Sequence, residues 1–84
     1  MTASSLIFEK VGDINSTYAY LCVYDAVDKK NPFMEIAVTE AKILQYTIYP
    51  GNRNVTLSVE DWSCIQEKAY EFLPVALSEF EGEN

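Results

Sequence analysis

The sequence predicts an α+β fold: an antiparallel β-meander of four to five strands with one C-terminal α-helix packed on one sheet face. Two patterns carry this prediction. Between Thr17 and Tyr49, apolar and polar residues alternate in short runs, which is typical of strands with one buried face. From Thr56 to Leu73, apolar residues recur at steps of three and four, which is typical of an amphipathic helix. Because the loops between strand segments are short, we expect neighbouring strands to run antiparallel.

Four segments are predicted as strands, and a short fifth is added before the helix. The second segment gives the clearest pattern, because it is rich in aromatic and β-branched residues. The polar stretch Asp25–Pro32 and the turn residues Pro50–Asn52 separate the segments. The predicted strands are Leu6–Val11, Thr17–Tyr24, Phe33–Thr39, Ile43–Tyr49 and the short Asn54–Leu57.

The predicted helix begins after Ser58, whose hydroxyl can accept a backbone N–H of the first turn. Asp61 follows three residues later, as the carboxylate of a capping box does. Pro74 cannot donate an N–H, so the helix is expected to kink or end there. The apolar face is expected to cover alternate residues of the sheet. These are Leu21, Val23, Ile36, Val38, Leu44 and Ile48, lying under Trp62, Ile65, Ala69, Phe72 and Leu73.

The chain is short and acidic. Its 84 residues are expected to form a single domain, 1–84, with one core. The net charge is −7, and it is concentrated from Ser58 onward, where seven acids face one base. Binding to phosphates needs clustered Lys and Arg, so nucleic acid is not expected as a direct ligand. A basic protein partner suits this charge better.

Few residues suggest chemistry. The chain contains no histidine, and Cys22 and Cys64 lack the spacing of a zinc or redox motif. Asp25 and Asp28 followed by two lysines form a poor calcium loop. We therefore expect no catalytic residues, no metal and no cofactor, and predict that the protein is not an enzyme. With no apolar run long enough to cross a membrane and no secretory leader, the expected location is the cytoplasm.

Two surfaces are predicted to bind a partner. The first is the sheet face opposite the helix, where tyrosines would supply contact area at low entropic cost. The second is the outer face of the helix, which carries an acidic stripe. The predicted partner-binding residues are Tyr18, Tyr20, Tyr24 and Tyr49 on the sheet and Glu60, Glu67 and Glu71 on the helix. Each surface also has a plainer interpretation without a partner. The tyrosines could simply be half-buried in the domain, and the acidic residues could simply be exposed to solvent.

Residues 31–73, NPFMEIAVTEAKILQYTIYPGNRNVTLSVEDWSCIQEKAYEFL, have the layout of sheet hairpins followed by a capped helix that opens LSVEDW. In this layout, and in its small, acidic, histidine-free composition, the chain resembles the immunity proteins of bacterial polymorphic and contact-dependent growth-inhibition toxin systems. The resemblance implies tight binding to a cognate basic toxin domain, often a nuclease. Such binding would cover the toxin's active site or mimic its substrate.

Other classes of function stay open at this point. The chain could be a structural or adaptor subunit that forms a homodimer or a larger assembly through its Tyr-rich sheet face. It could also be a phage-type acidic inhibitor that imitates nucleic acid. An enzyme that uses Glu35 with Glu9 as a carboxylate pair comes last.

Overall fold

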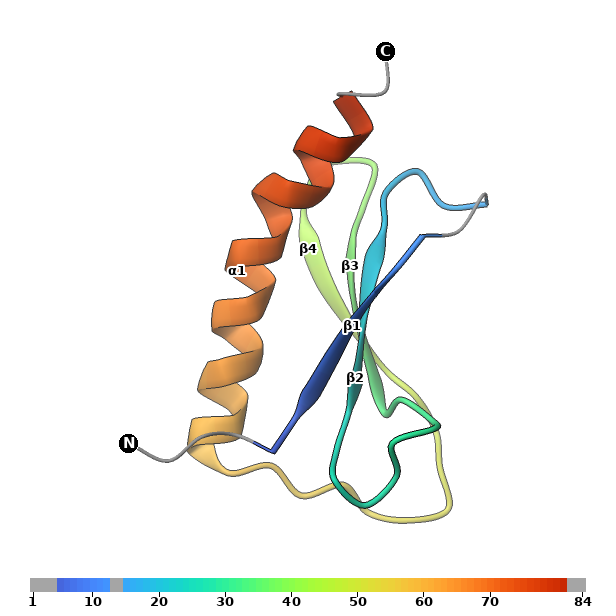
Figure 1. Cartoon of the computed structure of the whole chain (residues 1–84), viewed down its shortest axis with the longest axis vertical. Coiled ribbons are helices and arrows are strands. Elements are labelled where there is room, and N and C mark those ends of the chain that lie inside the picture. Colours follow the sequence, from blue (N-terminus) through green and yellow to red (C-terminus); the bar gives the residue numbers. More distant parts are fainter. Residues whose placement is uncertain (1–4, 13–14, 82–84) are drawn as a thin grey trace.

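The computed structural model describes residues 5–12 and 15–81. Four antiparallel strands form one sheet in the order β1-β2-β3-β4, and one helix follows them, so the predicted α+β meander is confirmed (Figure 1). The elements are β1 (Ile7–Val11), β2 (Tyr20–Tyr24), β3 (Met34–Val38), β4 (Leu44–Ile48) and α1 (Val59–Glu81). The start of the chain, on which the expectation of no secretory leader depends, lies outside the described residues.

The predicted fifth strand does not form. Residues 54–57 have no strand structure and lead from β4 to the helix. Val55 and Leu57 in this segment are half-buried and pack against the core with their side chains. The segment crosses the end of the sheet toward the helix (Figure 1), so its backbone does not pair with β4. β4 therefore remains an edge strand.

The helix begins as predicted and extends further than predicted. The N–H of Asp61 donates to Ser58 Oγ at 2.9 Å, and the N–H of Ser58 donates to Asp61 Oδ2 at 3.0 Å, which is a reciprocal capping box. The helix does not end at Pro74 but continues to Glu81. Pro74 lies on the exposed side, and the carbonyl it leaves unpaired belongs to Tyr70. The Tyr70 side chain is largely exposed as well, so water can reach that carbonyl.

The core lies between the sheet and one face of the helix. Leu21, Val23 and Ile36 are buried in it as predicted, and Met34, on the same face, is buried as completely. The helix contributes Ile65, Ala69, Phe72 and Ala76. The registers Leu21↔Ile36 and Val23↔Met34 place these sheet residues directly opposite one another, so they form one apolar surface.

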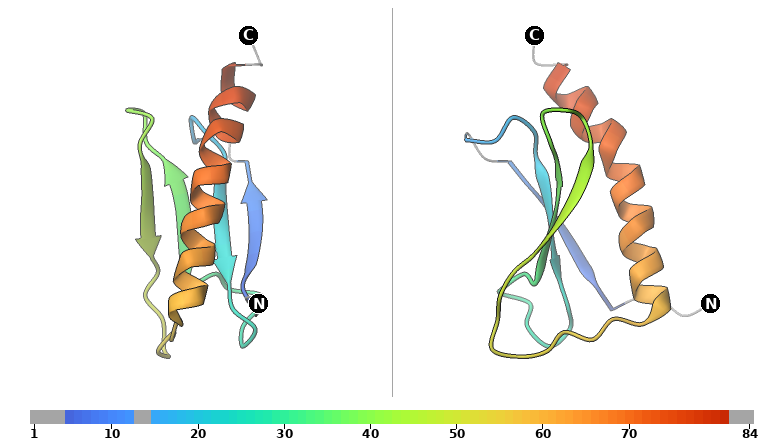
Figure 2. Two further views of the ribbon diagram at one scale, coloured as in Figure 1. Left: turned by 90° about the vertical axis from the view of Figure 1, so that its left-hand side faces the viewer. Right: turned by 180° about the vertical axis from the view of Figure 1, so that it is seen from behind.

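The helix does not cover the whole sheet. It packs most closely on β3 and leaves β4 beside it rather than beneath it (Figure 2). Ile48, predicted as core, is consequently 64% exposed, and Trp62 is 37% exposed. Trp62 instead contacts Tyr46, with the ring centroids 5.3 Å apart.

In the part of the chain that the structure describes, no helix is long and apolar enough to cross a membrane.

Candidate functional site

The sheet face opposite the helix is the main candidate for a binding site, and we call it the open face. No described element covers it (Figure 2). The strand register aligns a row of side chains across it, because Glu9 lies opposite Cys22, Cys22 opposite Glu35, and Glu35 opposite Thr47. The residues that alternate with the core positions therefore form one surface of polar, aromatic and apolar side chains, the apolar ones including Ile7 and Val11 of β1.

Two tyrosines on the open face donate hydrogen bonds to the carboxylates of Glu9 and Glu35. Tyr24 Oη donates to Glu9 Oε1 at 2.7 Å, and Tyr49 Oη donates to Glu35 Oε1. The hydrogen bond to Glu9 is the main cause that raises the pKa of Tyr24 to about 12. Burial, followed by the hydrogen bond to Glu35, raises the pKa of Tyr49 strongly. Both phenols therefore remain protonated donors near neutral pH, and each carboxylate keeps lone pairs for further donors.

Cys22 lies in the middle of this face and is only 7% exposed. Burial raises the pKa of its thiol, and the nearby carboxylates of Glu35 and Glu9 raise it further. A protonated, sheltered thiol is a poor nucleophile. Glu9 and Glu35 are separated by two strand spacings, about 10 Å, with Cys22 between them. The carboxylates of Glu9 and Glu35 are therefore suited to accepting hydrogen bonds from a partner.

The predicted tyrosines do not all lie on the open face. Tyr20, Tyr24 and Tyr49 are half-buried there, but Tyr18 is 8% exposed and belongs to the core. The prediction that Tyr18 is exposed on the open face is therefore wrong. The prediction extended the alternation of β2 to Tyr18, which precedes the strand. Outside a strand, neighbouring side chains need not point to opposite faces.

The predicted acidic residues Glu60, Glu67 and Glu71 are all exposed. Their helical spacing places them on the side of α1 that faces away from the sheet. Because the helix covers one side of the sheet (Figure 2), the open face and this acidic stripe lie on opposite sides of the two-layer domain. One flat contact cannot include both, so the seven predicted residues form two separate surfaces.

Sequence reasoning missed an ordered loop between β2 and β3. Asp25 accepts the N–H groups of Val27 and Asp28, and Asp28 accepts those of Lys30 and Asn31. These are Asx turns, and aspartates spaced three apart beside an Asn are the signal that could have predicted them. Both carboxylates therefore accept hydrogen bonds from the backbone of the loop in which they lie. Among the described residues, no group of three or more Cys, Asp or Glu is placed to hold a metal ion.

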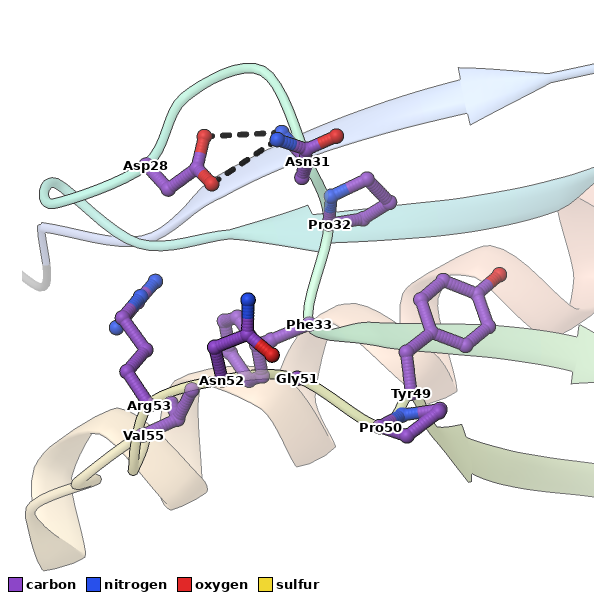
Figure 3. A pocket seen from close by; sticks show the side chains of 10 residues that line it. All are labelled: Asp28, Asn31, Pro32, Phe33, Tyr49, Pro50, Gly51, Asn52, Arg53 and Val55. Atoms are coloured by element: carbon purple, nitrogen blue, oxygen red, sulfur yellow. Dashed lines mark hydrogen bonds between the residues drawn. The ribbon is translucent and has the colours of Figure 1, made fainter.

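Arg53 joins this loop to the segment before the helix. Its guanidinium donates to Asp25 Oδ1 at 2.8 Å, and this bond is the main cause that lowers the pKa of Asp25. An open pocket of about 620 Å³ lies between the two segments (Figure 3). Phe33 and Val55 line it, with Asp28 and Asn31 on one side and Arg53 on the other. Because the contact between Arg53 and Asp25 is long-range, the sequence pattern does not indicate it.

Comparison of the chain with protein-family models, with curated proteins and with solved structures gives no match.

Proposed function

We propose that this chain is a protein-binding inhibitor of the immunity class, which neutralises a cognate basic toxin domain through the open face of its sheet. The observation that carries the proposal is the pairing of Tyr24 with Glu9 and of Tyr49 with Glu35 on a sheet face that no described element covers. The net charge of −7 and the resemblance in layout to immunity proteins support the same class of partner.

The chemistry of the open face favours arginine or lysine on the partner. Carboxylates that phenols already orient lose little conformational freedom when they accept a guanidinium, so binding loses less entropy. Charge-assisted hydrogen bonds to such carboxylates are about twice as strong as neutral ones. The rings of Tyr20 and Tyr24 beside them offer faces on which a guanidinium can stack.

The acidic stripe has a different role in this proposal. Because Glu60, Glu67 and Glu71 lie on the other side of the domain, they act on the partner through the long-range field. Such a field speeds encounter and weakens as salt screens it. An adaptor role, in which two copies join through their open faces, is less favourable because the contact would bring four carboxylates together.

The test begins with the neighbouring open reading frame, where a large toxin with a basic C-terminal domain is the expected partner. Surface-plasmon kinetics then measure binding of that purified domain at low and moderate salt. Glu35→Gln should raise the dissociation rate about tenfold, because a charged acceptor is lost at the contact. Glu40→Gln, which removes the same charge at an exposed turn, is the matched control and should leave dissociation unchanged.

Glu67→Lys combined with Glu71→Lys should instead slow association and flatten its dependence on salt. Growth rescue of cells that express the toxin domain provides the cellular measurement. Equal dissociation rates for Glu35→Gln and Glu40→Gln would reject the open face as the docking surface. The absence of any binding by the parent protein would reject the immunity function.

A further inference from the structure

β4 presents an unprotected edge. Backbone hydrogen bonds join Thr39 to Ile43 and Phe33 to Tyr49, so the odd-numbered residues of β4 pair inward with β3. The N–H and C=O groups of Leu44, Tyr46 and Ile48 consequently point away from the sheet. Such a row of groups is a template for pairing with another strand.

Natural edge strands are usually protected by charges, and the two edges of this sheet differ in this respect. β1, at one edge, carries Glu9 and Lys10. At the other edge, the segment from Ile43 to Asn52 contains no charged residue at all. In a chain with a net charge of −7, a neutral edge is the place where a second copy meets the least repulsion.

The two flanks of the helix differ in the same way, because one is charged and the other is neutral. Its flank toward β1 is charged, since Glu79 forms an ion pair with Lys10 and the Lys68 ammonium lies 6.0 Å from the centre of the Phe8 ring. The flank toward β4 carries Trp62 and Tyr70, both near Tyr46. By helical spacing, residues 59–79 contribute no acid and no base to this flank. Its residues are Val59, Trp62, Ser63, Gln66, Tyr70, Leu73, Pro74 and Leu77.

We propose that a second copy of this chain docks on the neutral surface formed by β4 and the adjacent flank of α1. The two β4 strands pair antiparallel, and a two-fold axis passes through Tyr46. This surface is suited to self-association for two reasons. An uncharged strand that pairs antiparallel is complementary to itself. A two-fold contact also uses the same patch of each copy. Ile48 and Tyr70, which are 64% and 72% exposed, become covered in the dimer.

The ends of β4 fix the register. Beyond Ile48, Pro50 has no N–H to donate, and before Leu44 the backbone turns at Lys42, whose φ is 66°. Pairing centred on Tyr46 is the arrangement that uses all three outward-facing residues, with Leu44 opposite Ile48 of the second copy. The two β3 strands are then three strand spacings, about 14 Å, apart. A helix with its side chains is about 10–12 Å wide, so the helices on the two β3 strands fit side by side.

This inference does not depend on the proposed function, because pairing at the edge leaves the open face of each copy uncovered. Its first test is the mass of the purified protein by light scattering over a range of concentrations. We expect a species of twice the chain mass of 9.5 kDa. Ile48→Lys should weaken the association at least tenfold, because it places charge in the neutral contact. Val27→Lys, at a position 77% exposed in the β2–β3 loop, is the matched control and should dimerise like the parent.

Cysteine cross-linking tests the register in a Cys64→Ser background. In the proposed pairing, Gln45 lies opposite Thr47 of the second copy in a non-hydrogen-bonded pair, with Cα atoms about 4.5 Å apart. A mixture of Gln45→Cys and Thr47→Cys chains should therefore form a disulfide-linked dimer on oxidation. Each variant alone should not, because its two cysteines are offset diagonally by about 8 Å.

Both substituted positions are exposed, so folding should be retained, and circular dichroism checks it. A monomer at millimolar concentration would overturn the proposal. So would a dimer that Ile48→Lys leaves intact. Cross-linking of a single variant by itself, or none in the mixture, would reject the pairing of β4 with β4.

Discussion

Along β2, Leu21 and Val23 point toward the helix and are buried, whereas Tyr20 and Tyr24 on the opposite face are half-exposed. The same comparison holds along β3, where Met34 and Ile36 are buried and Glu35 between them is half-exposed. One face of the sheet thus contributes most of the apolar burial that stabilises the fold. The other carries groups that remain available to a partner.

Cys22 is an exception to this difference in exposure between the two faces. It lies on the open face yet is buried, without any covering layer among the described residues. Burial raises the pKa of its thiol, and the charges of Glu35 and Glu9 beside it raise this pKa further. The large side chains of the open face therefore shelter one another.

The largest expected effect is on the covered face. Ile65 is fully buried between the helix and the sheet, so Ile65→Ala should lower the free energy of unfolding by about 2–5 kcal/mol. Urea unfolding followed by circular dichroism measures this change. Val75→Ala, at an exposed position of the same helix, should cost less than about 0.5 kcal/mol. Similar costs at the two positions would mean that the helix does not pack on the sheet through Ile65.

A smaller effect is expected at the border of the covered face. Trp62 is 37% exposed and contacts Tyr46 at the side of the core. Trp62→Ala should cost about 1–3 kcal/mol through lost apolar burial and the lost aromatic pair. No enclosed cavity forms there because the site is open to water. The same urea titration tests the ranking, and a larger cost for Trp62→Ala than for Ile65→Ala would contradict it.

The sequence predicted features that depend on neighbouring residues. The reciprocal cap of Ser58 and Asp61 was foreseen because both partners lie within one turn, and the two faces of β2 followed from alternation. The position of the helix over β3 was not foreseen, because it depends on how the layers pack. Sequence reasoning therefore buried Ile48, which is exposed because the helix does not cover β4. Tyr18 was expected on the open face because the alternation of β2 was extended to a residue before the strand. The helix was expected to kink or end at Pro74, and it continues to Glu81 because Pro74 lies on its exposed side.

The open face should respond to alkaline pH. The pKa of Tyr24 is raised from 10.0 to about 12 in the folded protein, chiefly by its hydrogen bond to Glu9. Above pH 10 the unfolded chain therefore loses this proton more readily than the folded one. The resulting stabilisation is fully present below pH 10 and is lost as pH rises to about 12.

Ultraviolet absorbance of the phenolate, measured during an alkaline titration, checks this behaviour. Glu9→Gln should move one tyrosine titration toward pH 10, because the neutral amide no longer disfavours the phenolate charge. Glu40→Gln, an exposed acid in the turn after β3, is the control and should leave the curve unchanged. A parent protein in which every tyrosine titrates near pH 10 would show that the pair of Tyr24 and Glu9 does not persist in solution.

The smallest expected effect concerns the ion pair between Lys10 on β1 and Glu79 near the end of α1. Both side chains are about half-exposed, at 48% and 46%, so solvent screens their attraction. A double-mutant cycle with Lys10→Ala and Glu79→Ala should give a coupling free energy of about 0.2–1 kcal/mol. The coupling should shrink in high salt. Because this pair joins the covered face of β1 to the helix, a coupling of zero at low salt would show that apolar packing alone holds that edge.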